Sequence, residues 1–299
     1  MAVDPEKILD EADEAFDNDD YVLARKKFTK ARKLFQKEGD GKGECMCLIG
    51  IAETYSSVEQ WNEAMKYYEE CLRIATELNN QDDIFACYEG LGDSYSSLEN
   101  WDEAAKYYQK GLDLAKKIND KEGEFSCLIN IGHTFSSLQK WDDAIEYFNK
   151  SMEVVKSLDN PELEFLCLIG IGDAYFGSNK CNDALEYYEN AKKIAASLKN
   201  KEDEASCLES IGDCYNALGK ITDAIEHYQE ALKLAKQSNN LQFQFINLIK
   251  IGDTHTSNNQ KTEALEHYKT ALQLAKRIQD TSWIELAKTC IDQLSDLDS

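Results

Sequence analysis

Apolar residues recur along this chain at intervals of three and four positions, which is the spacing of an amphipathic helix. In residues 124–138, Leu128, Ile131, Phe135 and Leu138 form one such stripe, and a second stripe follows in residues 142–158. The same two stripes return at a step of 40 residues over almost the whole length. Each unit therefore predicts a first helix (helix A), a polar turn and a second helix (helix B), and the chain is expected to contain no strand.

Three marks keep the same frame from unit to unit. In helix A a branched residue precedes a small one, at Ile51-Ala52, Leu91-Gly92, Ile131-Gly132, Ile171-Gly172, Ile211-Gly212 and Ile251-Gly252. An aromatic residue follows three positions later in most units, at Tyr55, Tyr95, Phe135, Tyr175 and Tyr215. In helix B an alanine is followed after four positions by Phe28, Tyr68, Tyr108, Phe148, Tyr188, Tyr228 or Tyr268. Self-similarity at one fixed step predicts a stacked repeat array, in which we expect the glycines at close contacts between helices A and B.

The spacing Tyr88-x-x-Leu91-Gly92-x-x-Tyr95, followed by Ala104-x-x-x-Tyr108, resembles the signature of the tetratricopeptide repeat (TPR) family. The resemblance implies an all-α solenoid, a right-handed superhelix whose helices A line a concave face. The step is 40 residues rather than 34 and no proline closes helix B, which resembles the subgroup containing Pins/LGN and rapsyn.

We expect a single array over residues 1–299. Its seven repeats are predicted at about 5–40, 41–80, 81–120, 121–160, 161–200, 201–240 and 241–280, followed by a capping helix at 281–299. In that last helix the apolar stripe consists of Trp283, Leu286, Ala287, Cys290, Ile291 and Leu294. Helix B is expected to begin after a polar N-cap residue, for which the frame offers Asn62, Asp102, Asp142, Asn182, Thr222 and Thr262.

The charge balance narrows the classes of partner. With 56 acidic and 33 basic residues the formal net charge is −23, which disfavours nucleic acids and anionic membrane surfaces. No apolar stretch is long enough to cross a bilayer, and Met1 to Asp20 lacks the pattern of a secretory signal. We therefore expect a soluble, cytoplasmic protein without membrane insertion.

Ten cysteines are present, and half of them share one frame position: Cys47, Cys87, Cys127, Cys167 and Cys207. Neighbouring helices of this kind lie roughly 10 Å apart, too far for a disulfide, and no C-x-x-C pair suggests zinc. We expect these cysteines to be buried, reduced and free of metal. His227 and His267 occupy a helix B position that is tyrosine in earlier units, so we interpret them as substitutes for an aromatic residue. No catalytic constellation is found, and neither enzyme activity nor a cofactor is expected.

Three rows of helix A residues point to one face, because their offsets are three and four. The first row is acidic in five of six units, at Glu53, Asp93, Asp173, Asp213 and Asp253, with His133 as the exception. The second row supplies Glu89 and Glu209 together with Ile49, Ile129, Ile169 and Ile249. The third row is Met46, Ala86, Ser126, Leu166, Ser206 and Ile246.

In the TPR family, ligands usually lie along this face, and none of the three rows contains lysine or arginine. The resemblance and the acidic row together suggest a scaffold or adaptor that binds a basic or hydroxyl-rich peptide with apolar anchors. The isoleucines of the second row would receive those anchors. A regulatory subunit or ligand sensor, whose superhelix changes shape on binding, is the alternative. The acids could also be ordinary solvated groups, or pair with lysines of their own repeat.

Overall fold

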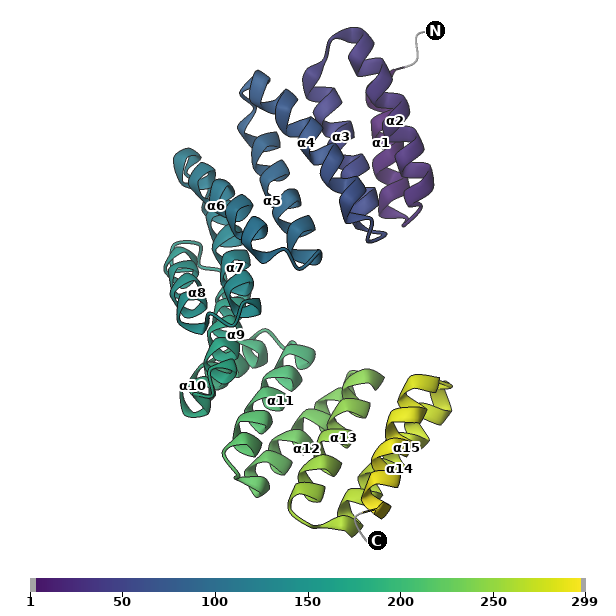
Figure 1. Ribbon diagram of the computed structural model, residues 1–299, viewed down its shortest axis with the longest axis vertical. Helices are drawn as coiled ribbons and strands as arrows, with labels where there is room; N and C mark the ends of the chain where they lie inside the picture. Colours follow the sequence, from purple (N-terminus) through teal and green to yellow (C-terminus); the bar gives the residue numbers. More distant parts are fainter. Residues whose placement is uncertain (1–3, 297–299) are drawn as a thin grey trace. The chain divides into compact units, whose positions relative to one another are not determined.

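The structure, a computed structural model, describes residues 4–296, and every regular element in that range is an α-helix (Figure 1). The all-α prediction is confirmed. The helices are α1 (Pro5–Asp17), α2 (Tyr21–Glu38), α3 (Gly41–Ser56), α4 (Trp61–Leu78), α5 (Gln81–Ser97), α6 (Trp101–Ile118), α7 (Lys121–Ser137), α8 (Trp141–Val155), α9 (Pro161–Gly177), α10 (Cys181–Ser197), α11 (Lys201–Ala217), α12 (Ile221–Gln237), α13 (Leu241–Ser257), α14 (Lys261–Ile278) and α15 (Thr281–Asp296).

The helices gather in two compact units, which divide between Leu158 and Asp159. Unit 1 contains α1 to α8 and unit 2 contains α9 to α15. Within each unit, successive helices pack against one another as helical hairpins, odd-numbered helices being helix A and even-numbered helices helix B. A single array over residues 1–299 stays a prediction. Within residues 4–296, no helix combines the length and the apolar character that crossing a bilayer would require.

The turns between helices share one backbone device. A residue with positive φ recurs every 20 residues, from Asp19 to Gln279, and only at positions 39 and 219 is that residue glycine. At the end of α4, Asn79 has φ 54°, and the next amide, that of Asn80, donates to the carbonyl oxygen of Ala75 at 2.9 Å. The left-handed residue and the hydrogen bond from the following amide to a carbonyl of the last helical turn end the helix and reverse the chain within two residues. The 40-residue repeat is thus built from two half-units of equal length.

The predicted N-caps of helix B are wrong. Helix B begins one residue before each of them, for example at Trp61, and the cap position belongs to Gln60, whose side chain makes no capping hydrogen bond. The left-handed residue at position 59 turns the chain earlier than the sequence pattern suggested. Side-chain caps occur mainly at helix A, where for example Asp40 accepts from two amides at the start of α3. Among the helices B, α2 has such a cap, in which Asp20 accepts from the amide of Leu23.

The predicted close contact between glycine and the helix B aromatic ring is confirmed. A methyl group built on Gly92, Gly132, Gly172, Gly212 or Gly252 would lie less than 3.0 Å from the ring of the tyrosine or phenylalanine 16 residues later. At Gly212 the distance to a ring carbon of Tyr228 would be 2.5 Å. The absence of a side chain here lets helix A lie directly on the ring, and the ring itself is almost wholly buried.

A second aromatic pair lies beside that contact in every repeat from the second to the seventh. The helix A aromatic stacks on a helix B ring twelve residues later, as in Tyr95 and Tyr107, whose ring centroids are 5.5 Å apart. His267 occupies this helix B position in the last repeat and stacks on His255 at 5.6 Å. His227 takes it in the preceding repeat, where it contacts Tyr215. Both histidines therefore stand where the aromatic residue was expected.

The five cysteines of the helix A frame are fully buried, as predicted, and none of the ten cysteines forms a disulfide. Burial raises the pKa of Cys47, Cys207 and Cys214 to about 12, because the thiolate loses its hydration. Cys290 in α15 is the one cysteine that is only partly buried.

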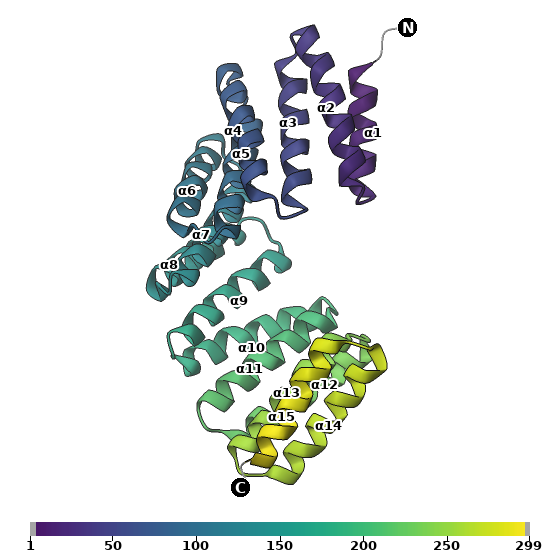
Figure 2. The ribbon, with the colours of Figure 1, turned by 45° about the vertical axis from the view of Figure 1, so that its right-hand side comes forward.

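The last helix covers the end of unit 2. α15 lies against α14 and beside α13 (Figures 1 and 2). Trp283 stacks on Phe245 with ring centroids 4.6 Å apart, and Ala287 and Leu294 are buried. Leu286 departs from the predicted apolar stripe, because 47% of it is exposed.

We expect Gly212→Ala to lower the free energy of unfolding by about 1–3 kcal/mol, because the methyl group overpacks the Tyr228 ring. Urea unfolding should give a lower midpoint. Gln229→Ala on the exposed face of α12 is the control, with an expected change of less than about 0.5 kcal/mol. Equal stability of the Gly212 variant and the native chain would contradict the close contact.

Brief treatment of the native protein with a thiol reagent should label Cys290 first, because the other nine cysteines are buried. Mass spectrometry should then find one modified site, and Cys290→Ser should remove the fast phase. In urea all ten thiols should react. Rapid native labelling of several helix A cysteines would show that the repeats open more readily than their packing indicates.

Candidate partner-binding face

The first-row aspartates are held by tyrosines of helix B. A phenol of the same repeat, fifteen residues later, donates a hydrogen bond to one carboxylate oxygen. The pairs are Asp93 with Tyr108 (2.6 Å), Asp173 with Tyr188 (2.7 Å), Asp213 with Tyr228 (2.7 Å) and Asp253 with Tyr268 (2.6 Å). Each bond fixes the rotamer of its aspartate, so the carboxylates are oriented before any partner arrives.

The repeat without an acid in the first row follows the same logic. In the repeat that has His133 instead of an aspartate, the helix B residue is Phe148, which has no hydroxyl group. The two rings meet edge to face, with centroids 5.1 Å apart. Both frame positions, the acid of helix A and the aromatic residue of helix B, are visible in the sequence. Only the structure shows that the acid and the phenol are hydrogen-bonded to each other.

Second-row glutamates connect successive helices A. Glu89 in α5 accepts a hydrogen bond of 2.6 Å from the hydroxyl group of Ser126 in α7. In unit 2, Glu209 in α11 accepts one of 3.2 Å from the side-chain amide of Asn247 in α13. Asn247 is fully buried and takes the place of a cysteine in this frame, which explains why the cysteine series ends there. These glutamates therefore have a structural part in the stacking of helices A.

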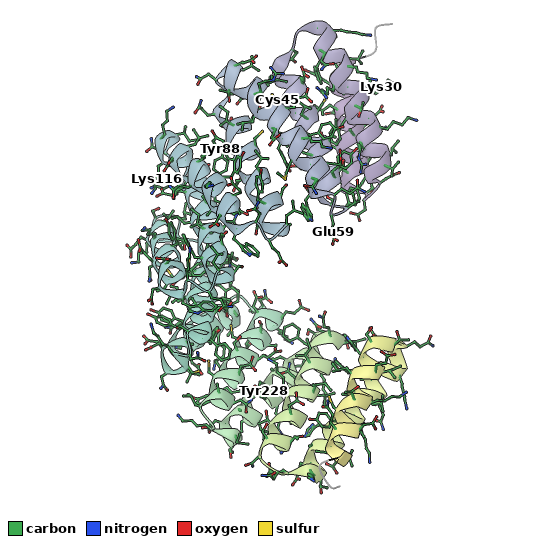
Figure 3. All side chains as sticks on the ribbon, viewed as in Figure 1. Lys30, Cys45, Glu59, Tyr88, Lys116 and Tyr228 are labelled. Carbon is green, nitrogen blue, oxygen red and sulfur yellow. The ribbon has the colours of Figure 1, made fainter. Side chains whose placement is uncertain are left out.

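A lysine that the three rows did not include neutralises part of the acidic face. The Nζ atom of Lys250 in α13 lies 2.6 and 2.8 Å from the two carboxylate oxygens of Asp213 and 2.9 Å from Glu209. All three side chains are between 18% and 32% exposed. The equivalent positions of the second to sixth repeats hold glycine, asparagine or serine, and the first repeat has Asp10. The sequence signal was therefore one lysine at a frame position that is otherwise mostly small. Tyr228, labelled in Figure 3, is the phenol partner of Asp213, and the Nζ atom of Lys250 lies 5.7 Å from its ring centroid.

The remaining carboxylates are reached by solvent but poorly hydrated. Burial raises the pKa of Glu53, Glu89, Asp93 and Asp253 above the ordinary range, and the tyrosine bond only partly opposes this at Asp93 and Asp253. Asp93 and Asp253 are nevertheless exposed to solvent. Neighbouring helices displace much of the water around these groups while leaving one side open. A positively charged group arriving from solvent would restore the lost stabilisation.

Apolar residues on this face are distributed differently from the prediction. Ile129 is only 8% exposed, and Ile169 and Ile249 are half-buried among core residues, which leaves little surface for a ligand. The third row is more open. Met46 in unit 1 is 45% exposed and Leu166 in unit 2 is 46% exposed.

A pocket of about 520 Å³ lies beside the last Asp–Tyr pair, between α13, α14 and α15. Its lining residues are Asp253, Thr256, Ser257, Tyr268, Cys290, Gln293 and Leu294. Cys290 takes the frame position of Lys250, so here a thiol stands where the preceding repeat has an ammonium group. No set of His, Cys, Asp or Glu side chains in the described part of the chain is grouped to hold a metal ion.

The helical hairpins of equal length, joined by identical turns, define a helical-repeat protein. The tetratricopeptide repeat family matches residues 12–77, 83–157 and 163–237, and a second description of the same repeat matches residues 247–277. The chain belongs to the tetratricopeptide repeat family.

Solved structures share the fold at low sequence identity. A signal transduction ATPase (STAND) protein with a TPR sensor, from Pyrococcus horikoshii, aligns with a TM-score of 0.79 at 19% identity, over 96% of this chain and 44% of that one. This chain thus spans less than half of that protein. The apo form of RapI aligns at 0.76 and 16% identity over 95% and 80% of the two chains. The quorum sensor NprR from B. thuringiensis aligns at 0.65 and 14% over 100% and 90%. No curated protein sequence matches the chain.

We expect Lys250→Met to lower the free energy of unfolding by about 2 kcal/mol, between the values for exposed and buried ion pairs. The change leaves Glu209 and Asp213 side by side without their cation. Burial works against the charged form of Lys250, but Asp213 and Glu209 outweigh it and raise the pKa of the lysine. The loss should therefore be full at neutral pH and shrink as the pH rises through that raised pKa, where the native lysine loses its proton. Urea titrations at several pH values measure this. Lys233→Met, on an exposed part of α12, should have little effect at any pH.

Proposed function

We propose that this chain is a non-enzymatic scaffold or adaptor that binds a protein or peptide through the acidic helix A face. The observation that carries the proposal is the repeated Asp–Tyr pair, whose carboxylate is oriented, open to solvent and incompletely hydrated. Burial disfavours the charged form of this carboxylate, and its pKa is raised for that reason. The charged carboxylate therefore lowers the stability of the free chain. A cationic partner would convert this cost into binding energy.

Lys250 serves as an internal example of the ligand group. Its ammonium group lies against Asp213, which is itself bonded to Tyr228, so an ammonium group fits at an Asp–Tyr pair. At Asp93 and Asp253 the equivalent positions are Asn130 and Cys290, which bring no charge. We infer that a lysine or arginine of the partner binds there, in unit 1 and in unit 2 independently.

The surroundings of these carboxylates indicate which other chemical groups the partner segment would carry. Serine or threonine hydroxyl groups can donate to carboxylate oxygens, so a hydroxyl-rich segment also fits. Apolar anchors would contact Met46 in unit 1 and Leu166 in unit 2, with only smaller contacts from Ile129, Ile169 and Ile249. The proposed face thus keeps Glu53, Glu89, Asp93, Asp173, Glu209, Asp213 and Asp253, but Asp213 and Glu209 are already engaged by Lys250.

A regulatory or sensor protein is the second candidate. It is supported by the TPR sensor of the STAND protein and by the quorum sensor NprR, both of which share this fold. In that case ligand binding should change the overall dimensions of the chain, which small-angle scattering with and without the ligand measures. Both candidates include a cytoplasmic location and membership of the long-repeat subgroup of Pins/LGN and rapsyn, and neither includes a catalytic residue, cofactor or metal.

The test is the variant Asp93→Asn with Asp253→Asn, measured against an array of basic, acidic and neutral peptides. Asparagine keeps an acceptor for the tyrosine, so the fold should remain. The native carboxylates have raised pKa values, so they lower stability above those values, and the variant should be as stable as the native chain or more stable at neutral pH. Binding of basic peptides should weaken at least tenfold, with a reduced salt dependence.

Glu186→Gln with Glu226→Gln, on exposed positions of helices α10 and α12, is the matched control and should leave binding unchanged. If the double asparagine variant binds every basic peptide as the native chain does, at low and high salt, the acidic face is not the binding surface. A gain in stability without any loss of binding would have the same meaning.

A further inference from the structure

The second helix of the chain has a charge opposite to that of the whole protein. α2 contains seven basic residues and one acid, Glu38, so its formal charge is +6. The chain has a net charge of −23, so the other residues together carry −29. The net charge of the whole chain conceals this basic helix.

The two arginines of α2 are used inside unit 1. Arg25 donates to Thr54 in α3, and its guanidinium group lies 3.8 Å from the ring centroid of Tyr55. Arg32 pairs with Glu44 in α3, at 3.1 Å, and with Glu70 in α4. Both therefore join α2 to the neighbouring repeat and are not available to an external partner.

The exposed cations are all lysines. Lys27 pairs with Glu11 in α1 at 2.8 Å, which removes it from the set. Four exposed lysines remain at offsets of four, three and four, which places them on one face of the helix. This lysine face consists of Lys26, Lys30, Lys33 and Lys37. Within residues 4–296 none of the four makes an ion pair; Lys30 is labelled in Figure 3.

Other repeats neutralise the same positions on their own helix. In α4, Lys66 pairs with Glu63 at 2.5 Å and Arg73 with Glu77 at 2.9 Å. The helix α6 has the corresponding pair of Lys106 and Glu103. Residues 22–37 of α2 contain no acid, so the lysine face has lost the counter-ions that the repeat pattern normally provides.

An apolar residue continues this face towards the start of the helix. Val22, four positions before Lys26, is 78% exposed, the highest value among the large apolar side chains described. A shallow hollow of about 460 Å³ on α2 is lined by Val22, Arg25, Lys26, Thr29, Lys30 and Lys33. The surface therefore combines an apolar end with a row of unpaired ammonium groups.

We propose that the lysine face of α2 docks a short acidic segment of a partner protein, with an apolar side chain of that segment placed on Val22. The distance from Lys26 to Lys37 along the helix is roughly 16 Å, because each residue rises 1.5 Å. An extended peptide covers that length with about five residues. Net repulsion from the acidic remainder of the chain is screened beyond about 8 Å at physiological salt, so a short segment responds to the local charge.

The chemistry favours carboxylates over other anions. Phosphate groups are best recognised by the bidentate guanidinium group, and both arginines of α2 are already engaged. Insertion into an anionic membrane would need the apolar face of the helix, but Ala24, Phe28 and Phe35 are buried in unit 1. A long nucleic acid would extend onto the acidic surface beyond α2 and be repelled there.

The experiment uses the full chain and a dye-labelled peptide with one leucine followed by about four glutamates, long enough to span the lysine face. Fluorescence anisotropy should show binding that weakens with salt, and the matching glutamine peptide should not bind. Lys26→Glu with Lys30→Glu and Lys33→Glu should reduce the affinity at least tenfold. Val22→Ala should weaken binding of the leucine peptide, but not of an all-glutamate peptide.

The matched control is Lys269→Glu with Lys276→Glu and Arg277→Glu, which makes the same change in net charge on exposed positions of α14. It should change the affinity less than about twofold. Lys26→Gln with Lys30→Gln and Lys33→Gln should also weaken binding. This variant tests the proposal if the α2 variant with three glutamates fails to fold. Asp93→Asn with Asp253→Asn should leave acidic-peptide binding intact, so this surface and the acidic helix A face can fail separately.

Three results would overturn the proposal. The first is the absence of binding by the native chain at low salt, and the second is an equal loss in the α2 and α14 triples. The third is tighter binding of phosphatidylserine vesicles or duplex DNA than of the acidic peptide, with the same dependence on Lys26, Lys30 and Lys33. That last outcome would assign the surface to a lipid or nucleic acid.

Discussion

The close approach of helix A to the aromatic ring of helix B is the constraint on which the other features of each repeat depend. A glycine lies against the ring, as Gly212 does against Tyr228, and the ring is then buried between the two helices. The phenol of that buried ring emerges beside the next residue of helix A, where it meets Asp213. In the four repeats with an Asp–Tyr pair, core packing therefore fixes the position of the carboxylate. A repeat with phenylalanine in helix B offers no phenol, and in the fourth repeat the acid is absent as well.

Much of the fold could be predicted from the sequence because it depends on periodic, local properties. The apolar spacing predicted the helices, and the recurring glycine and cysteine predicted small residues at buried contacts. The turns were less visible. Left-handed residues such as Glu59, Gln139 and Lys199 have side chains that normally avoid positive φ, and no composition signal marks them. Their early reversal of the chain explains why the expected N-caps of helix B fall inside the helix.

The candidate site was only half visible for a different reason. The acidic row follows from the frame, but the partner of each acid lies fifteen residues away or in the next repeat, and side-chain contacts of that kind are not periodic. Lys250 occupies a frame position that holds glycine, asparagine or serine in the second to sixth repeats, so nothing in its own position indicated an ion pair with Asp213. Likewise the net charge of −23 described the average surface and hid α2. Neither the net charge of the whole chain nor the residue types at one frame position reveal an interaction that occurs in only one repeat.

The turns have a consequence for how such a chain can change length. Every described helix boundary from Asp19 to Gln279 uses the same left-handed joint at the same interval. A segment cut between two joints 40 residues apart therefore begins and ends with matching backbone directions. Removal or duplication of such a segment preserves the alternation of helices A and B, whereas a 20-residue event would place two helices of the same kind in succession. Genetic gain and loss of whole repeats is thus compatible with the fold. Because the backbone joints are alike, the repeats differ from one another in their side chains.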